Sequence, residues 1–288
     1  MENTSWLFTQ TELEQSPSRL AGLSIEMENR YRQKGIYIIK KIGQAMNQKH
    51  YPTLATASVF FHRFYVFHSF IQYSPYVPAL ACLFLAGKVE DIPKKCKDLV
   101  LKAQEIFPVE YIWLTADELI LIERLLLQTI RFDLYIEHPV TKNVSEAKIA
   151  SEAKNFFEAE IASEAKNFFE AEIVSEAKIY SFLVQYAKIT NAWTFVNDSL
   201  TTNICLLWEP EIIAIAMLFM AFKMTKLEIG EENLEKIVKK EEEEENDWWE
   251  EQKIKVKQKN YVSNLTKEMI EEICHRVLDV VDTDNLEK

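Results

Sequence analysis

Long apolar stretches fill the first half of the chain. Residues 51–70 and 75–91 are apolar on most of their sides, and residues 115–134 are apolar nearly all round after a candidate N-cap at Thr115. Helices with this pattern are typical of the centre of a bundle. We therefore predict that two or three helices are enclosed by their neighbours, the one over 75–91 ending ahead of Pro93.

Two other stretches have a single apolar face. Residues 94–107 are amphipathic, and residues 24–46 place on one side Tyr31, Gly35, Ile38, Ile39 and Ile42. Ser16 and Pro17 are the residue types favoured at an N-cap and at the first position of a helix. Five helices with short connectors over residues 24–135 predict a compact all-helical domain.

The chain changes character after His138 and Pro139. Residues 149–160 read IASEAKNFFEAE, and residues 161–172 repeat that string. A shift of 12 residues turns the apolar face by about 120° around a helix, whereas a continuous seam needs a period near 3.5 or 3.67 residues. We interpret residues 139–179 as a duplicated helical insert between two domains, and a dedicated interaction arm is the alternative.

A second helical block is expected over residues 180–282. Its recognisable helices cover 180–188, 192–200, 209–224 and 266–281, and the last of them has an apolar stripe made of Met269, Ile270, Ile273, Val277 and Leu278. Residues 228–260 switch from acidic to basic and predict a solvated acidic loop. The remaining parts are an N-terminal segment, 1–23, and a C-terminal tail, 283–288.

Composition narrows the class of protein. Hydrophobic residues make up 48% of the 288 residues, with only 5 Gly and 8 Pro, which favours a folded helical protein over a disordered one. The net charge of −12 argues against non-specific binding of nucleic acid. We expect no membrane span and no secretory signal in the sequence. Four widely spaced cysteines fit a reducing compartment.

The sequence offers only weak candidates for a metal, phosphate-binding or catalytic site. Glu272 and His275 have the spacing of a di-iron ligand pair, but such a site needs a second pair, so a surface role explains them better. His62 and His68 lie on different sides of their predicted helix. We find no glycine-rich phosphate loop and no nucleophile with an obvious base. The sequence therefore predicts no catalytic, metal or cofactor site.

Two charged residues stand out because they interrupt apolar helices. Lys88 lies near a helix C-terminus, where the dipole favours a cation and where Glu90 and Asp91 offer local partners. Glu123 interrupts the run LILIERLLL, and a buried carboxylate is costly without a partner. Lys88 and Glu123 could instead share one face and bind the exposed backbone of another protein.

Several strings resemble one family. LFLAGKVEDIPKKCKD at residues 83–98 and ERLLLQTIRFDLYIEHP at residues 123–139 resemble the cyclin box of the transcriptional cyclins, with the K group first and the T and L groups next. The resemblance covers most of the chain apart from about 140–179 and the acidic loop. It implies two tandem five-helix cyclin folds, at 24–138 and 180–282, the second carrying the insert and the loop.

The resemblance also implies a function. Members of this group bind and activate a cyclin-dependent kinase by pushing its αC helix inward, and the related kinases act on the repeated tail of RNA polymerase II. The chain would be a nuclear regulatory subunit in a heterodimer, not an enzyme, and would need no cofactor. The kinase-binding positions of the family map onto Lys88, Glu123 and Glu90, with Arg32 bracing that surface.

The sequence departs from the family pattern in two places. Residues 31–35 read YRQKG where cell-cycle cyclins carry a substrate-docking motif, so docking of that kind is not expected. Only residues 189–191 separate the predicted helices at 180–188 and 192–200, where the family has a longer linker. The sequence therefore does not define the first two helices of the second block. Two other functions are kept as alternatives: a cyclin-fold transcription factor or scaffold that binds protein or DNA without a kinase, and a metal-dependent helical enzyme. A third possibility is that the insert makes this chain a degenerate copy that folds poorly.

Overall fold

The computed structural model describes residues 6–47, 51–139, 191–228 and 267–284, and these residues form helices, turns and loops without any strand. The all-helical prediction is thus confirmed for the described part. The chain divides into two compact units, one built on residues up to 139 together with 197–210, and one that includes residues 211–278. No helix in the described ranges is long and apolar enough to cross a membrane.

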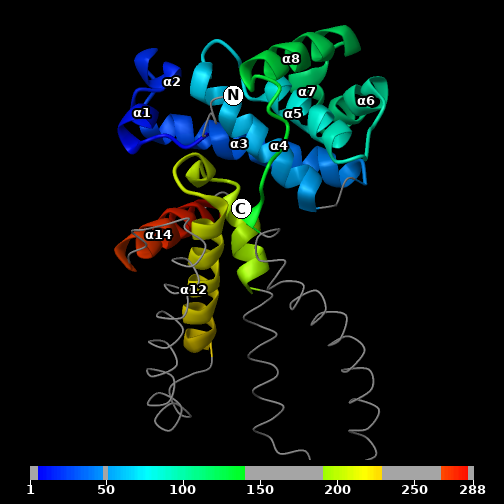
Figure 1. Cartoon of the computed structure of the whole chain (residues 1–288). Helices are drawn as coiled ribbons and strands as arrows, with labels where there is room; N and C mark the ends of the chain where they lie inside the picture. Colours follow the sequence, from blue (N-terminus) through cyan, green and yellow to red (C-terminus); the bar gives the residue numbers. More distant parts are fainter. Residues whose placement is uncertain (1–5, 48–50, 140–190, 229–266, 285–288) are drawn as a thin grey trace, which may run out of the picture. The chain divides into compact units, whose positions relative to one another are not determined.

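The first unit has eight helices in its described residues before 139 (Figure 1). They are α1 (Gln10–Glu14), α2 (Pro17–Leu20), α3 (Ile25–Ala45), α4 (Tyr51–Phe67), α5 (Tyr76–Val89), α6 (Cys96–Ile106), α7 (Pro108–Tyr111) and α8 (Ala116–Thr129). The predicted caps are observed, because the side chains of Ser16 and Thr115 accept hydrogen bonds from the backbone N–H groups of Arg19 and Glu118. The two short helices α1 and α7 were not expected from the sequence.

Helix α5 is the centre of this unit. It packs against α3, α4, α6, α7 and α8, and all of its residues from Pro78 to Gly87 are buried. Burying a leucine such as Leu80 or Leu83 stabilises the fold by about 1.5–3 kcal/mol relative to leaving it exposed. The prediction that residues 75–91 form an enclosed helix is confirmed, and α4 is likewise buried over most of its length.

Helix α8 is not enclosed, so the enclosed helices of the first unit are α4 and α5, in line with the predicted two or three. In α8 only Leu119, Glu123 and Leu126 are buried, whereas Ile120 is 39% and Leu121 58% exposed. Helix α8 covers α5 from one side only, so its outer face remains open to solvent. Single exposed apolar residues are normal on protein surfaces, and composition therefore does not separate an enclosed helix from a one-sided one.

Two segments outside the helical bundle also belong to the first unit. Trp6 donates a hydrogen bond from Nε1 to Asp133 Oδ2 at 2.7 Å, and its ring lies 6.1 Å from that of Phe67. Residues 197–210 contain a short 3₁₀ helix, η1 (Ile204–Leu206), and the carbonyl of Leu206 accepts a hydrogen bond from Phe8. Both segments thus add hydrogen bonds to the unit beyond the five predicted helices.

The described helices of the second block agree with the sequence pattern. Residues 191–199 are helical, α12 (Pro210–Glu228) is buried from Ile212 to Met217, and α14 (Lys267–Asp284) buries Ile270, Ile273 and Val277. Cys274 Sγ lies 3.3 Å from the carbonyl oxygen of Ala216, which joins α14 to α12. The predicted insert at 139–179, the helix at 180–188 and the loop at 228–260 lie outside the described residues.

Candidate functional site

The structure brings Lys88 and Glu123 together. The Lys88 ammonium donates hydrogen bonds to both carboxylate oxygens of Glu123, at 2.6 and 2.9 Å. The Glu123 side chain is only 8% exposed, whereas that of Lys88 is 44% exposed. The pair therefore lies at the edge of the core, with its carboxylate largely covered and its ammonium open to an approaching molecule.

Packing of α5 against α8 positions this pair. Lys88 is in the last turn of α5, where a cation is favoured by the helix dipole, and Glu123 is on the buried face of α8. The ammonium also lies 4.0 Å from the centre of the Phe84 ring, one turn earlier on α5. Because a lysine has three N–H donors and two bind Glu123, one donor remains for a partner. The pair presents a fixed positive group beside carboxylate lone pairs.

Glu90 belongs to a different cluster. Its carboxylate accepts a hydrogen bond from the Thr56 hydroxyl at 2.6 Å, and Nε2 of His138 lies 2.8 Å from the same hydroxyl. Since the single hydroxyl hydrogen is donated to Glu90, Nε2 of His138 must donate to Thr56. This chain of bonds joins the end of α5, the first half of α4 and the segment after α8. Glu90 therefore holds these three elements together instead of pairing with Lys88.

Arg32 lies within the fold and not on its surface. It is 2% exposed, and Nη2 and Nε donate to Glu28 Oε1 at 2.7 and 3.2 Å. The other oxygen of Glu28 accepts from the Ser16 hydroxyl at 2.8 Å. Because the guanidinium is enclosed, a direct contact with a partner protein does not fit this geometry. The expectation that Arg32 braces the surface from beneath stays a prediction.

His62 completes the Arg32 cluster. Nε2 of His62 lies 2.9 Å from the carbonyl oxygen of Leu200, so this nitrogen carries the proton, and Nδ1 can accept from Arg32 Nη1 at 3.4 Å. Burial and the nearby Arg32 cation lower the pKa of His62 to about 3, which keeps the ring neutral. Thr56 and His62 are six residues apart, about 9 Å along α4, so the Arg32 and Glu90 clusters are separate.

These buried histidines make the fold sensitive to acid. Burial also lowers the pKa of His138 to about 4, with a contribution from Arg63, whereas both rings titrate near 6.5 in the unfolded chain. Below pH 6.5 the unfolded state binds protons that the folded state does not, so stability is lost as the pH falls. We expect the free energy of unfolding to drop by about 2–3 kcal/mol between pH 7.5 and pH 5.5.

Urea unfolding at the two pH values measures this drop. His62→Gln should remove about half of the pH dependence, because one of the two buried rings no longer titrates. His275→Gln, at an exposed position on α14, is the matched control and should leave the dependence unchanged. An unchanged pH dependence in His62→Gln would show that this ring takes up its proton over the same pH range in the folded and the unfolded chain.

The other candidates from the sequence have structural partners. Glu272 accepts a hydrogen bond from Arg276 at 2.7 Å, and His68 Nε2 lies 2.8 Å from the hydroxyl of Thr129. The described residues contain no group of three or more histidine, cysteine, aspartate or glutamate side chains placed to hold a metal ion. These residues are therefore accounted for by contacts within the fold.

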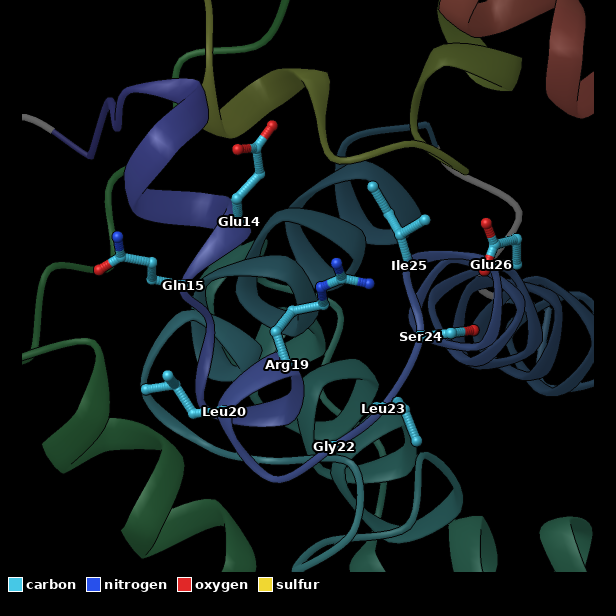
Figure 2. A pocket seen from close by; sticks show the side chains of 9 residues that line it. All are labelled: Glu14, Gln15, Arg19, Leu20, Gly22, Leu23, Ser24, Ile25 and Glu26. Atoms are coloured by element: carbon cyan, nitrogen blue, oxygen red, sulfur yellow. The ribbon is translucent and has the colours of Figure 1, made fainter.

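A hollow with a volume of about 550 Å³ is lined by residues of α1, α2, the loop after α2 and the start of α3 (Figure 2). Its side chains are of mixed charge, with Arg19 between Glu14 and Glu26. The pKa of Glu26 is lowered by its own backbone N–H and by the Ser24 hydroxyl, so this carboxylate is already stabilised by its own helix start. The hollow has no buried polar group aimed into it that would define a ligand.

Sequence reasoning missed Thr56, Phe84 and His138, which contact the predicted site residues. A buried threonine or phenylalanine in an apolar helix gives no signal of its own, because its role depends on which helix it faces. Cys96 is similar: it lies near the Lys88–Glu123 pair, and burial, followed by the Glu123 charge, raises the pKa of its thiol. None of these contacts can be read from spacing along one helix.

The comparisons with known proteins all point to one family. Residues 4–135 match the N-terminal domain of cyclins. The chain is 38% identical to cyclin-K of Homo sapiens over 96% of its length, and 31% identical to cyclin-T of Drosophila melanogaster over 78%. These alignments cover 40% of the human protein and 18% of the fly protein. The chain thus spans less than half the length of these two relatives.

Solved structures support the same fold. The chain superimposes with a TM-score of 0.58 and 18% identity on a chain of the CAK complex from Chaetomium thermophilum, covering 95% of this chain and 76% of that one. It superimposes with a TM-score of 0.56 and 16% identity on a chain of the yeast RNA polymerase II CTD kinase complex CTDK-1, covering 77% and 63%. The helical architecture, the match over residues 4–135 and the identity to cyclin-K together place this chain in the cyclin family.

Proposed function

We propose that this chain is the regulatory subunit of a cyclin-dependent kinase that acts on the repeated tail of RNA polymerase II in the nucleus. The chain itself carries out no catalysis in this proposal. It binds the kinase beside the αC helix and holds that helix inward, so that the Lys–Glu ion pair and the metal site of the kinase are in place. The similarity to K- and T-type cyclins and to the CTD kinase complex supports this assignment.

The Lys88–Glu123 pair is the observation that carries the proposal. A half-exposed ammonium would ordinarily move with its flexible stem, but both oxygens of a largely buried carboxylate hold this one. A fixed donor beside fixed acceptors is suited to bind the C=O and N–H groups at the end of a partner's helix. Glu90 and Arg32 would contribute by holding α3, α4 and α5 in position.

Reversing the charge of Lys88 tests this proposal. Lys88→Glu places two carboxylates together, and we expect it to weaken kinase binding by about a hundredfold, or roughly 2.7 kcal/mol. Because Glu123 is largely buried, this variant also loses stability, so loss of binding alone is ambiguous. The charge swap Lys88→Glu with Glu123→Lys separates the two effects.

The swap restores an ion pair inside the fold but reverses the charges offered to a partner. If the pair binds the kinase, the swapped variant recovers thermal stability without recovering kinase co-purification from nuclear extract. Recovery of both would show that the pair is only structural and that the kinase surface lies elsewhere. The same swap at the exposed Glu272–Arg276 pair of α14 is the control and should change neither property.

The double variant Lys88→Ala with Glu123→Ala should weaken kinase binding by less than the sum of the two single effects, because both residues serve one contact. A cyclin-fold scaffold or transcription factor that works without a kinase is the second function considered from the sequence. It predicts that no kinase co-purifies with the wild-type chain. The same pull-down therefore distinguishes the two functions.

A further inference from the structure

The start of α6 carries three lysines in an acidic protein. Lys94 is half-buried and both Lys95 and Lys97 are exposed, although the chain has a net charge of −12. None of the three forms a hydrogen bond or an ion pair with another residue in the described part of the chain. This includes the nearest acidic residues along the chain, the exposed Asp91 and Asp98. We call the three residues the α6 lysines.

The α6 lysines do not stabilise their own helix. Lys95 is the N-cap of α6, and its side chain makes no capping hydrogen bond. Lys97 lies in the first turn, where the helix dipole favours an anion and disfavours a cation, and only Asp98 has the favoured sign there. Their positions lower the stability of α6, so a role within the fold does not account for them.

The α6 lysines flank the residue that joins α6 to the proposed kinase-binding pair. Cys96 Sγ lies 3.5 Å from the carbonyl oxygen of Ala116, which is about 10 Å along α8 from Glu123. Burial and then the Glu123 charge raise the pKa of the Cys96 thiol, and the Lys88 charge lowers it, so both charges of the pair reach this thiol. A stable interface covers about 800 Å² on each partner, a circle with a radius of roughly 16 Å. A kinase bound to the pair therefore also reaches the start of α6.

Unpaired ammonium groups at the edge of an interface select the charge of the partner. A lysine that loses water there without gaining a carboxylate opposes binding, whereas a carboxylate opposite the α6 lysines is attracted both by them and by the positive end of the helix dipole. We propose that the α6 lysines bind an acidic segment of the partner kinase, next to the surface that contacts Lys88 and Glu123.

This inference rests on the proposed function, because the partner is the kinase that Lys88 and Glu123 bind. It adds the chemistry of a second contact and a basis for choosing among kinases. Charges at the edge of an interface act mainly on the rate of association, and like charges there discriminate against a wrong partner. Since the chain as a whole is acidic, the α6 lysines offset its repulsion of an acidic segment. A kinase with basic residues at that place would associate more slowly.

Association kinetics with the full chain test this inference. The probe is the kinase that mass spectrometry identifies in the pull-down with the wild-type chain, purified separately. Lys95→Glu with Lys97→Glu should lower the association rate constant about tenfold at about 50 mM NaCl, while the dissociation rate constant changes by less than about threefold. Because salt screens exposed charges, the loss of association rate should shrink to less than about threefold at about 500 mM NaCl.

This variant should fold at least as well as the wild type, because acidic residues are favoured at the start of a helix. Thermal unfolding checks this, so that slower association is not attributed to a loss of structure. Lys34→Glu with Lys41→Glu is the matched control, since it changes the net charge equally at exposed positions of α3. Its association rate constant should stay within about threefold of the wild type if the α6 lysines act locally and not through net charge.

Three results would overturn the role of the α6 lysines. These are an unchanged association rate in Lys95→Glu with Lys97→Glu, an equal loss in the control variant, and a loss that persists at high salt. Binding of a single-stranded oligonucleotide by the wild-type chain, abolished by the same two changes, would also overturn it, because the occupant would then be a nucleic acid.

The same measurements separate this inference from the proposed function. A kinase that binds the wild type and Lys95→Glu with Lys97→Glu at the same rate would refute only the role of the α6 lysines. A wild-type chain that binds no kinase at either salt concentration would refute the proposed function, and this inference with it. The charge swap at Lys88 and Glu123 should prevent binding at both salt concentrations, whereas the effect of the α6 lysines depends on salt.

Discussion

Replacing Arg32 with alanine is expected to lower the free energy of unfolding by about 3–5 kcal/mol, because it leaves the buried carboxylate of Glu28 without its cation. Glu28 is 6% exposed, and Arg32 is its only partner of opposite charge among the ion pairs of the described residues. The same change removes the donor to His62 and a 3.5 Å contact to the carbonyl of Tyr65. Urea unfolding at pH 7.5 measures the loss.

A paired variant identifies the cause of this loss. Glu28→Gln with Arg32→Met removes both charges while keeping similar volumes, and it should destabilise the fold less than Arg32→Ala alone. Arg276→Ala, which breaks the exposed pair with Glu272, should cost about 1 kcal/mol or less. If Arg32→Ala were as mild as Arg276→Ala, the cluster would contribute little to stability, and its bracing role would be excluded.

Gly35→Ala is expected to have a similarly large effect, with a loss of about 3 kcal/mol. A methyl group at this position would overlap the ring of Phe61, which is fully buried. That ring has little room to move, because it packs against Tyr65 and Phe70 at ring-centre distances of 4.9 and 6.2 Å. Alanine favours a helix by about 1 kcal/mol over glycine, which offsets only part of the overlap.

Thermal and urea unfolding of Gly35→Ala measure this effect, and the loss corresponds to a melting temperature about 6–12 °C lower. Adding Phe61→Leu should recover part of the stability, since the smaller side chain makes room for the methyl group. Asn29→Ala, on the exposed face of α3, is the control and should not destabilise. A neutral Gly35→Ala variant would mean that α3 and α4 can move apart at this point without cost.

Hydrophobic periodicity was sufficient for the five long helices of the first unit, α3, α4, α5, α6 and α8. The predicted caps at Ser16 and Thr115 and the apolar side of α3 depend on neighbours within four residues along the chain, so they can be read from the sequence. Helix α8 is the exception. Whether Leu121 faces a neighbour or solvent depends on how many helices surround α8, and this information is not local.

The candidate site, too, was predictable only in part from the sequence. Charged residues within apolar runs identified Lys88 and Glu123, because burying a charge without a partner is costly wherever it occurs. Their mutual hydrogen bonds, at 2.6 and 2.9 Å, arise from the packing of α5 on α8 across 35 residues of chain. The sequence grouped Glu90 with Lys88, whereas the structure pairs Glu90 with Thr56 of α4.

The sequence by itself determined the helical class, the positions of most helices in the first unit and two charges that need partners. Each of these follows from interactions between residues that are close along the chain or from the cost of removing a charge from water. Only the tertiary structure decided which partner each charge has and that Arg32 is enclosed together with Glu28 and His62. The choice of partner depends on the distance and angle between helices, and many side chains set these together.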